Sequence, residues 1–569
     1  MIRIAILIIL LFVSNTDAFS QKTNDNLSNS DVKKIDNIFK SFNNTESPGV
    51  TISFIKNNAL IFSKSYGMAD LEHTTPIHSN SVFSLASVSK QFTVFAILLL
   101  EERGKLSLED DIKKYLPLFP NYQKKITIRH LATHTSGVKS HEQLLAQKGY
   151  ISDNVITKRD ALAMIYKQDE LNFNPGEEFN YSNAGYVLLA EIVEKVTGTS
   201  FAKFLKKEIF EPLSMKNSFV MDDYHKIVKN RANSYEIENG EYVNAPANYS
   251  YYGSTGLYTT AMDLTKWALN FSNLNIGSKR IFRKMKTLSK LNNNNTFGYA
   301  LGQFVGKYRG AEYIYHSGGD AGYRTFLGRF PETNSAVLLL SNNNTVNAQE
   351  LALKVVDVFM KSYDKPKSNS SLSNRLTSKI IKLPTSQLEK YSGHYLSQSS
   401  YIIRDIFVRN DTLIYSRKEQ NNRETPLFSL KKEHTFQLGD YKDLWIQFSN
   451  DNSQKRMKIF ENQVQVDVYN AYSPRRYSRK ELEGFTGVYY SKSLDTKYML
   501  EIKGGILIVI HPKMGEIMLS AIKNDGFLAS SWQFRFLEFK RNKENQIIGF
   551  SITSDRVRNT RFTKVKIKT

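Results

Sequence analysis

The stretch FSLASVSK, residues 83–90, holds a serine and a lysine three positions apart, Ser87 and Lys90. The apolar residues that follow, among them Phe92, Phe95 and Leu99, have the spacing of a buried helix. In a helix, Ser87 and Lys90 lie on one face, one turn apart. A serine hydroxyl is a weak nucleophile until a neighbour takes its proton. A partly buried lysine is suited to this, because burial lowers its pKa.

Patterns on both sides of this stretch predict an α/β domain. Residues 48–66 alternate between apolar and polar positions around a Lys56-Asn57-Asn58 turn, which is typical of a β-hairpin. Residues 313–340 return to strand character. We therefore expect an antiparallel sheet built from the hairpin and the late strands, with a helical cluster between them. Helical spacing is present at residues 31–42, 87–103, 159–168, 183–197 and 201–210.

The last third of the chain contains an internal repeat. The pattern Leu388-x-x-Tyr391-x-Gly393-x-Tyr395 recurs as Leu482-x-x-Phe485-x-Gly487-x-Tyr489. The surrounding pattern is one of short strands only, which predicts two consecutive antiparallel β-barrel-like domains of similar fold. Closure into a barrel is favoured because it removes exposed sheet edges. One large β-domain is the alternative.

The N-terminal segment predicts an exported protein. Residues 1–3 are basic, residues 4–13 are apolar, and Ala18 and Ser20 suit cleavage by a signal peptidase. Ten apolar residues are short for a membrane span, which needs about 20, so we expect no transmembrane anchor after removal of the signal.

The chain has no cysteine, which excludes disulfides, thiolate metal sites and a cysteine nucleophile. The predicted organisation is a signal peptide at 1–20, the α/β domain at 21–365, a linker at 366–383, and β-domains at 384–475 and 476–569.

The positive charge of the chain has no specific partner in the sequence. The net charge is +22, with 77 Lys and Arg against 55 Asp and Glu. The excess is spread along the chain, which is typical of a solvated surface. No nucleic-acid recognition motif is present, so we expect no nucleic acid as a partner. An anionic envelope polymer such as peptidoglycan remains a candidate for the basic β-repeat.

Two further motifs follow the serine and lysine in a fixed order. Tyr181-Ser182-Asn183 precedes the predicted helix at 183–197, and His316-Ser317-Gly318-Gly319 lies in the late strands. Together the three motifs resemble the serine β-lactamase and penicillin-binding-protein superfamily, which includes esterases and D-aminopeptidases. The resemblance covers about residues 31–360 and includes phrases at 126–137 and 253–263. It implies an acyl-enzyme mechanism that needs no cofactor and no metal.

The resemblance implies a role for each motif residue. Ser87 is the expected nucleophile, and Lys90 is the base for its attack or shares that role with Tyr181. Tyr181 would protonate the leaving group and activate the deacylating water. Asn183 would hold Lys90 and the substrate amide. The remaining expected site residues are His316, Ser317, which would bind a substrate carboxylate, Gly318, which would let the substrate backbone approach, and Gly319, whose N–H would form the oxyanion hole with that of Ser87.

The motifs depart from the class C β-lactamase versions, Tyr-Ala-Asn and Lys-Thr-Gly. The Tyr-Ser-Asn and His-Ser-Gly versions found here resemble the D-Ala-D-Ala carboxypeptidase, D-aminopeptidase and esterase branches. A histidine is a weaker and switchable cation, which makes an obligate carboxylate anchor less expected. We therefore predict an exported, periplasmic or extracellular serine hydrolase acting on peptide, amide or ester substrates. A β-lactamase, a catalytically silent sensor and a cell-wall-binding protein are the alternatives.

Two other sets of residues invite a functional reading. His130 and His134 have the i, i+4 spacing of a zinc motif, but the glutamate of His-Glu-x-x-His is missing. We expect them to be ordinary loop histidines. Arg324 is a candidate carboxylate ligand, and a surface ion pair is the simpler expectation for it.

Overall fold

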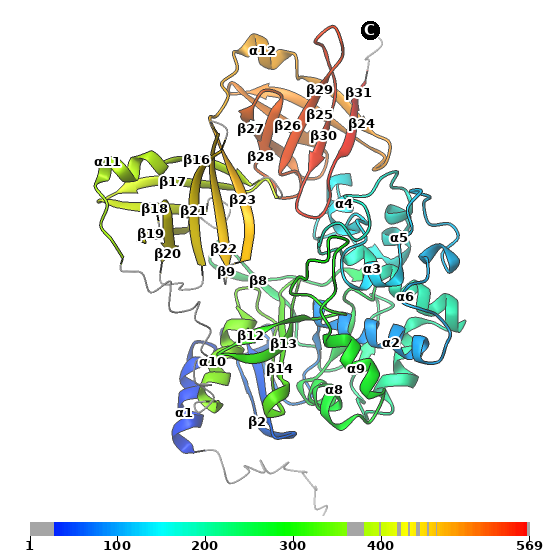
Figure 1. Ribbon diagram of the computed structural model, residues 1–569. Coiled ribbons are helices and arrows are strands. Elements are labelled where there is room, and N and C mark those ends of the chain that lie inside the picture. The colour runs from blue at the N-terminus through cyan, green and yellow to red at the C-terminus, as the bar shows by residue number, and fades with distance from the viewer. Residues whose placement is uncertain are drawn as a thin grey trace, which may run out of the picture.

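The structure is a computed structural model, and it comprises an N-terminal α/β domain followed by two closed β-barrels (Figure 1). It describes residues 28–360, 380–397, 400–417, 423–430, 433–439, 444–451, 454–461 and 464–565. The predicted fold class is confirmed. The predicted signal peptide and most of the predicted linker lie outside the described residues.

A six-stranded antiparallel sheet forms the centre of the α/β domain. The predicted hairpin supplies two of its strands, and Val50 of the first pairs with Ser341 of the last. Two helices, α1 (Asn29–Ile38) and α10 (Ala348–Phe359), cover one face and share an apolar core with it. In order across the sheet the strands are β12 (Phe304–Tyr308), β13 (Ala311–Asp320), β14 (Tyr323–Phe330), β15 (Ser335–Ser341), β1 (Val50–Lys56) and β2 (Ala59–Tyr66).

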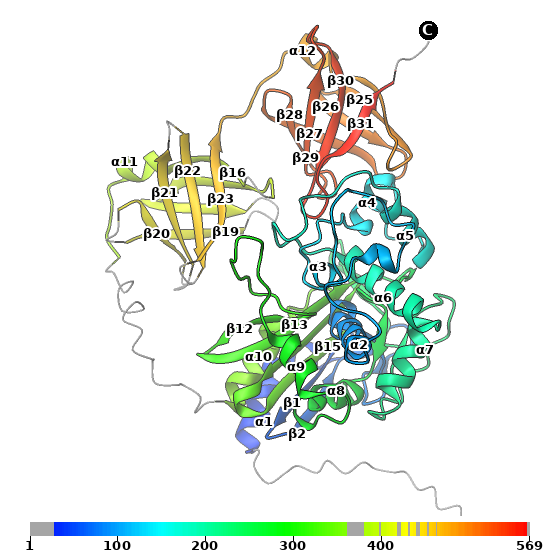
Figure 2. The same ribbon diagram turned by 45° about the vertical axis from the view of Figure 1, so that its right-hand side comes forward.

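A helical cluster packs against the other face of the sheet (Figure 2). At its centre is α2 (Lys90–Glu102), which is apolar and buried on nearly all sides, as expected for a helix enclosed by others. Around it lie α3 (Ile128–Ala132), α4 (His141–Lys148), α5 (Lys158–Tyr166), α6 (Asn183–Thr197), α7 (Phe201–Leu205), α8 (Ala261–Asn273) and α9 (Lys279–Lys286). None of the helices in the described ranges is both long and apolar enough to cross a membrane.

Three of the predicted helices differ in detail from the observed ones. The helix expected at 31–42 ends at Ile38 and is followed by a 3-10 turn, η1 (Lys40–Phe42). The helix expected at 87–103 begins as a 3-10 turn, η2 (Ala86–Ser89), before α2 starts at Lys90. The helix expected at 201–210 ends in a π-helical turn, η4 (Lys206–Phe210). Short strands complete the domain: β3 (Met68–Asp70), β4 (Thr75–Pro76), β5 (Phe83–Ser84), β6 (Ile156–Thr157), β7 (Phe219–Val220), β8 (Tyr235–Glu238), β9 (Glu241–Asn244), β10 (Tyr249–Ser250) and β11 (Leu257–Thr259).

Each barrel closes eight antiparallel strands. The first follows α11 (Thr385–Leu388) and has β16 (Gly393–Ser397), β17 (Ile403–Arg409), β18 (Thr412–Arg417), β19 (Arg423–Ser429), β20 (Thr435–Leu438), β21 (Leu444–Asp451), β22 (Gln454–Glu461) and β23 (Val464–Tyr472). The second follows α12 (Arg479–Glu483) and has β24 (Gly487–Ser491), β25 (Thr496–Lys503), β26 (Ile506–His511), β27 (Gly515–Lys523), β28 (Gly526–Ala529), β29 (Phe536–Arg541), β30 (Ile547–Thr553) and β31 (Thr560–Lys564).

The repeated sequence pattern makes the same contact in both barrels. Tyr395 donates a hydrogen bond to the carbonyl of Tyr391 at 2.8 Å, and Tyr489 donates to the carbonyl of Phe485 at 2.7 Å. In each case the tyrosine of the first strand ties the barrel to the short helical segment before it. The repeat therefore encodes the same contact between the first strand and the segment before it in both barrels.

The second barrel packs directly on the α/β domain, next to α4 (Figures 1 and 2). Leu144 and Leu145 of α4 and Met164 of α5 belong to the same apolar cluster as the interior of that barrel. Apolar burial favours this contact by about 25 cal/mol per Å². The barrel is thus held at one side of the helical cluster, where its loops reach the motif residues.

Candidate active site

Ser87 and Lys90 lie side by side at the start of α2. The 3-10 turn η2 has three residues per turn, which aligns side chains three positions apart. Lys90 Nζ lies 3.1 Å from Ser87 Oγ and donates to the carbonyl of Ser254 at 2.7 Å. Ala86, directly before the serine, has a φ of 47°, a backbone region that residues other than glycine seldom occupy and that concentrates at functional sites.

The surroundings of Lys90 make its amine a weak base for a lysine. Its side chain is fully buried, and its Nζ lies 4.9 Å from the centre of the Tyr181 ring and 5.4 Å from that of Tyr186. The pKa of Lys90 is lowered to about 7, mainly by burial; the charge of Glu142 opposes this shift and the Arg556 guanidinium adds to it. Near neutral pH, a large share of Lys90 is therefore unprotonated and able to accept the Ser87 proton.

Tyr181 lies in the loop that leads into α6. Burial raises the pKa of its hydroxyl well above the ordinary value, while the nearby Ser87 hydroxyl and Arg556 act in the opposite direction. The hydroxyl oxygen is buried and makes no hydrogen bond shorter than 3.5 Å to another group in the described part of the chain. Tyr181 is consequently protonated at neutral pH, next to the serine and lysine.

Asn183, the first residue of α6, is held by a glutamate rather than by Lys90. Its Nδ2 donates to Glu142 Oε2 at 2.6 Å, and Tyr251 donates to the other oxygen of the same carboxylate at 2.7 Å. Asn183 Oδ1 is buried and has no hydrogen-bond partner among the described residues. A buried acceptor without a partner in the protein is uncommon, which singles out this oxygen.

His316, on β13, is a neutral side chain in the structure. Burial lowers its pKa to about 3, and the charge on Lys90 acts in the same direction. Nδ1 lies 2.7 Å from the carbonyl oxygen of Ser317, so Nδ1 carries the proton. Nε2 lies 3.2 Å from the Tyr299 hydroxyl and accepts from it. The ring therefore orients neighbouring groups and supplies no positive charge for a substrate carboxylate.

The three residues after His316 divide between the two faces of the sheet. Ser317 is not brought to the other motif residues, because its hydroxyl donates to Gln349 of α10 at 3.1 Å. A Cβ atom on Gly318 would lie 2.2 Å from Thr325 Oγ1 and 2.6 Å from the carbonyl oxygen of Leu85. The missing side chain thus lets β13 approach the turn that carries Ser87. Gly319 is exposed, and a Cβ there would meet nothing closer than 3.7 Å.

Two carboxylates that the sequence motifs did not single out also belong to the site. The Glu142 carboxylate binds Asn183 and Tyr251, and its charge raises the pKa of Lys90. Asp320, the last residue of β13, accepts from Thr255 Oγ1 at 2.8 Å, and burial raises its pKa to about 6. Asp320 directly follows the His-Ser-Gly-Gly motif, which is a usable sequence signal. Glu142 lies on α4 with no motif around it.

The second barrel contributes an arginine to the site. The guanidinium carbon of Arg556, in the loop between β30 and β31, lies 4.9 Å from the centre of the Tyr181 ring. The backbone of Arg556 is held by the α/β domain: its N–H donates to Gln143 at 2.9 Å, and its carbonyl accepts from Asn172 at 2.9 Å. Within the described residues, no carboxylate forms an ion pair with its side chain.

The remaining residues of the same loop fasten the barrel. Arg558 makes a two-armed contact to Glu178 with distances of 3.1 and 2.8 Å. Asn559 donates to Glu170, which also binds the buried Lys139. The position of Arg556 over Tyr181 therefore rests on several contacts on both sides of it.

His130 and His134 each make a structural hydrogen bond of their own. His130 Nδ1 accepts from the N–H of Thr127 in a capping box at the start of α3. His134 Nδ1 accepts from the N–H of Ser182 at 3.1 Å, and its ring lies 4.1 Å from that of Tyr181. His134 thus supports the Tyr181 loop. Arg324 donates to the carbonyls of Ala321 and Tyr323.

Comparison with known proteins places this constellation in a family. The family model described as Beta-lactamase matches residues 35–358, more than half of the chain. The chain belongs to the beta-lactamase family. The predicted resemblance is confirmed, because this family includes penicillin-binding proteins and hydrolases.

Several individual proteins are similar to this chain. Penicillin-binding protein 4* of Bacillus subtilis is 29% identical over 386 residues, which cover 64% of this chain and 83% of that protein. Protein flp of Staphylococcus aureus (strain MRSA252) is 30% identical over 313 residues, covering 52% of this chain and 60% of that protein. The octameric penicillin-binding protein homologue from Pyrococcus abyssi superposes with a TM-score of 0.53 at 25% identity, covering 78% of this chain and 99% of that one. The penicillin binding protein from Bacillus halodurans, at 24% identity and a TM-score of 0.50, covers 59% of this chain and all of that one and shares the fold.

Proposed function

We propose that the protein is an exported serine hydrolase that forms an acyl-enzyme on Ser87 with peptide, amide or ester substrates. The observation that carries this proposal is the 3.1 Å separation of Lys90 Nζ from Ser87 Oγ, at a lysine whose pKa burial lowers to about 7. A base with a pKa near the working pH combines a usable unprotonated fraction with enough strength to take the serine proton. The family supports the reaction class.

The proposed mechanism assigns the proton transfers to separate groups. Lys90 takes the proton as Ser87 Oγ attacks the carbonyl carbon, and the N–H groups of Ser87 and Gly319 stabilise the oxyanion. Tyr181, which is protonated at neutral pH, donates to the leaving nitrogen or oxygen as the tetrahedral intermediate collapses. A water molecule then attacks the acyl group while the deprotonated Tyr181 accepts its proton, and Lys90 returns its proton to Ser87 Oγ as the acyl group leaves. Asn183 Oδ1 accepts from the substrate amide.

Labelling with a fluorescent penicillin or a fluorophosphonate tests this proposal. We expect the wild-type chain to be labelled and Ser87→Ala to remain unlabelled, because the acyl group is attached to that hydroxyl. Ser89→Ala is the matched control, since Ser89 is a neighbouring buried serine in the same turn. Equal labelling of the wild type and Ser87→Ala contradicts the proposal, and so does absence of labelling in the wild type with both probes.

The charges around Ser87 favour peptidase or esterase activity over β-lactam hydrolysis. The neutral His316 supplies no cation for the carboxylate that a β-lactam carries. Glu142 and Asp320 offer carboxylates that suit a substrate ammonium group, as in a peptide with a free amino end. Arg556 offers the opposite charge at the Tyr181 ring, which suits the carboxylate of a peptide and that of a β-lactam alike, so the ranking rests on His316 and the two carboxylates. Rates on nitrocefin, p-nitrophenyl acetate, and D-alanyl peptides blocked at either end separate these activities, and fast nitrocefin turnover contradicts the ranking.

Export is proposed from the N-terminal sequence. The basic start, the apolar residues 4–13 and the small residues Ala18 and Ser20 have the pattern of a cleaved signal. Fractionation of cells that express the full chain, followed by N-terminal sequencing, tests this. We expect a periplasmic or extracellular product that begins near Gln21, and a cytoplasmic product that keeps Met1 contradicts the proposal.

A further inference from the structure

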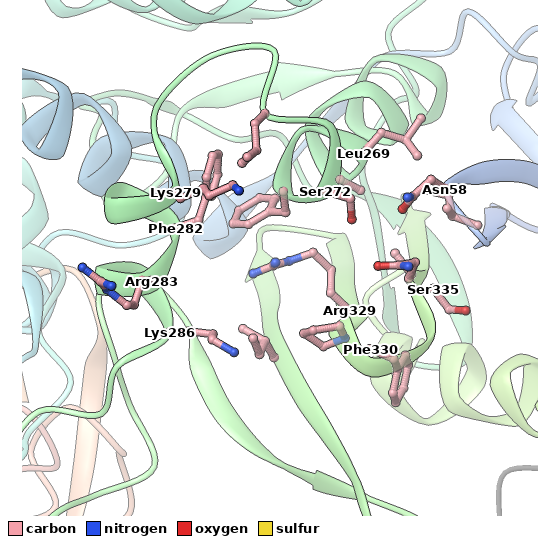
Figure 3. A pocket seen from close by; sticks show the side chains of 18 residues that line it. Asn58, Leu269, Ser272, Lys279, Phe282, Arg283, Lys286, Arg329, Phe330 and Ser335 are labelled. Carbon is pink, nitrogen blue, oxygen red and sulfur yellow. The ribbon is translucent and has the colours of Figure 1, made fainter.

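A cavity of about 630 Å³ lies between the helices α8 and α9 and the strands β14 and β15 (Figure 3). Leu269 and Phe271 of α8, Phe282 of α9 and Phe330 of β14 line much of its wall. None of the motif residues at Ser87 lines the cavity. A volume of this size, with mostly apolar walls and a few polar groups, is typical of a small-molecule site.

The charged residues that line the cavity are all cations. Lys279, Arg283 and Lys286 follow one another on one face of α9, at spacings of four and three residues. Arg329 reaches toward them from β14, and Figure 3 shows its side chain extending into the cavity on the side of α9. Lys286 pairs with Glu312 at 3.1 Å, whereas Lys279 and Arg283 make no ion pair within the described ranges. An anion fits this distribution of charge.

Arg329 is an unusual residue to find at the centre of such a wall. It is 7% exposed, and its guanidinium carbon lies 3.4 Å from the centre of the Phe271 ring. Its Nη2 donates to Gln303 at 2.7 Å. Its Nε is buried without a hydrogen-bond partner, and no carboxylate pairs with its side chain, in the part of the chain that the structure describes. A buried charge without a partner is costly. Burial therefore lowers the pKa of Arg329 to about 9.

We propose that this cavity binds an amphiphilic anion, a small molecule with one oxygen-bearing anionic head and an apolar body. The head accepts from the free Nε–H of Arg329 and lies among the cations of α9, while the body packs against Phe282 and Phe330. Charge-assisted hydrogen bonds to a buried arginine are the strong ones in such sites. The inference concerns a separate site and does not depend on the proposed reaction at Ser87.

The site is tested on the full chain with 8-anilinonaphthalene-1-sulfonate, an aromatic anion whose fluorescence reports burial. N-phenyl-1-naphthylamine, which has the same rings and no sulfonate, is the matched neutral probe. We expect one equivalent of the anion to bind, about tenfold or more tighter than the neutral probe. Octanoate should displace it, and inorganic phosphate at the same concentration should not. Equal affinity for the two probes, or equal displacement by phosphate, overturns the proposal.

Variants locate the binding. Arg329→Met keeps a long apolar stem and should weaken the anionic probe about ten- to a hundredfold while leaving the neutral probe unchanged. The double change Lys279→Gln with Arg283→Gln alters only exposed side chains and should weaken binding severalfold, more at low salt than at high salt. Arg280→Gln removes an exposed cation of α9 that does not line the cavity, and it should bind as the wild type does.

The double variant decides the matter if Arg329→Met fails to fold, as judged by its melting curve. Wild-type affinity for the anionic probe in the double variant overturns the proposal, and so does an equal loss in Arg280→Gln.

Discussion

Arg556 of the second barrel lies over the ring of Tyr181, with its guanidinium carbon 4.9 Å from the ring centre, and Lys90 Nζ lies at the same distance from that ring. Two cations near one another hold down each other's proton affinity. Arg556 accordingly lowers the pKa of Lys90 and that of Tyr181. A residue from a separate domain thus helps to set the protonation state of the proposed base.

Removal of this arginine should shift the pH dependence of the reaction. In Arg556→Ala we expect the acid limb of kcat/KM for an ester substrate to move to higher pH, because Lys90 loses a neighbour that keeps its pKa near 7. Arg556→Lys should keep part of the effect, since it keeps the charge. The measurement is a pH–rate profile from about pH 5 to about pH 9.

Arg558→Ala is the control for that experiment, because Arg558 lies in the same loop and pairs with Glu178. Its profile should follow the wild type even if the barrel is held less firmly. If the acid limb stays in place in Arg556→Ala, or moves equally in Arg558→Ala, the charge of Arg556 does not act on Lys90.

Substitutions of Lys90 test whether this residue acts as a proton acceptor or only as a positive charge. Lys90→Met and Lys90→Arg should both slow acylation by a fluorescent penicillin by about 10²- to 10⁴-fold. Arginine stays protonated at all ordinary pH values, so it cannot accept the serine proton. The measurement is the single-turnover labelling rate. Wild-type labelling by Lys90→Arg would show that only the charge of residue 90 is needed.

The sequence was sufficient for the parts of the site that are local in the chain. The three-residue spacing of Ser87 and Lys90 predicts the adjacency that the structure shows, because helical geometry fixes it. The position of Tyr181 directly before a helix and of His316 in a strand follow from patterns of the same kind. The alternation of β13, by contrast, takes the Ser317 hydroxyl to Gln349 of α10. Strand periodicity alone identifies two faces without saying which one meets the serine.

The rest of the site depends on long-range packing, for which the sequence contains no local signal. Arg556 reaches Tyr181 because its loop binds Gln143 and Asn172, residues some four hundred positions away in the chain. Glu142 lies in the site because α4 packs against both α6 and the second barrel. A single chain read by periodicity does not reveal which loop of a barrel meets which helix, since tertiary packing decides it.

Gly318 and Gly319 should respond differently to the same substitution. Gly318→Ala places a Cβ atom 2.6 Å from the backbone oxygen of Leu85, which cannot rotate away, so β13 or the Ser87 turn must shift. We expect a loss of about 1–3 kcal/mol in the free energy of unfolding, as for other overpacked sites. Slower acylation should accompany it. The measurement is urea unfolding together with fluorescent-penicillin labelling.

Gly319→Ala is the matched comparison, because its Cβ would make only ordinary contacts with Arg324, at 3.7 Å or more. Its free energy of unfolding should stay within about 0.5 kcal/mol of the wild type. Equal destabilisation by the two changes would mean that the close approach of Gly318 to Leu85 is not what requires a glycine.

Three buried histidines should make the fold sensitive to acid. His134, His141 and His316 are each at most 2% exposed, and burial lowers the pKa of all three. The unfolded chain binds protons at these residues near pH 6.5, whereas the folded chain binds them only at lower pH, about 3 for His316. Below pH 6.5 the unfolded state therefore holds more protons, and the free energy of unfolding falls as the pH falls through that window.

Asp320 acts in the opposite direction over a narrower window. Its pKa is raised to about 6, so between about pH 6 and its ordinary pKa of 3.8 the folded state holds the extra proton and gains stability as the pH falls. Because three histidines oppose one aspartate, the free energy of unfolding should decrease overall as the pH falls. The urea midpoint should thus be lower at about pH 5 than at about pH 7.5, and His316→Asn should show a smaller drop. The exposed His225→Asn should show the wild-type drop. A midpoint that is equal or higher at the lower pH would contradict the assignment of these histidines as buried neutral groups.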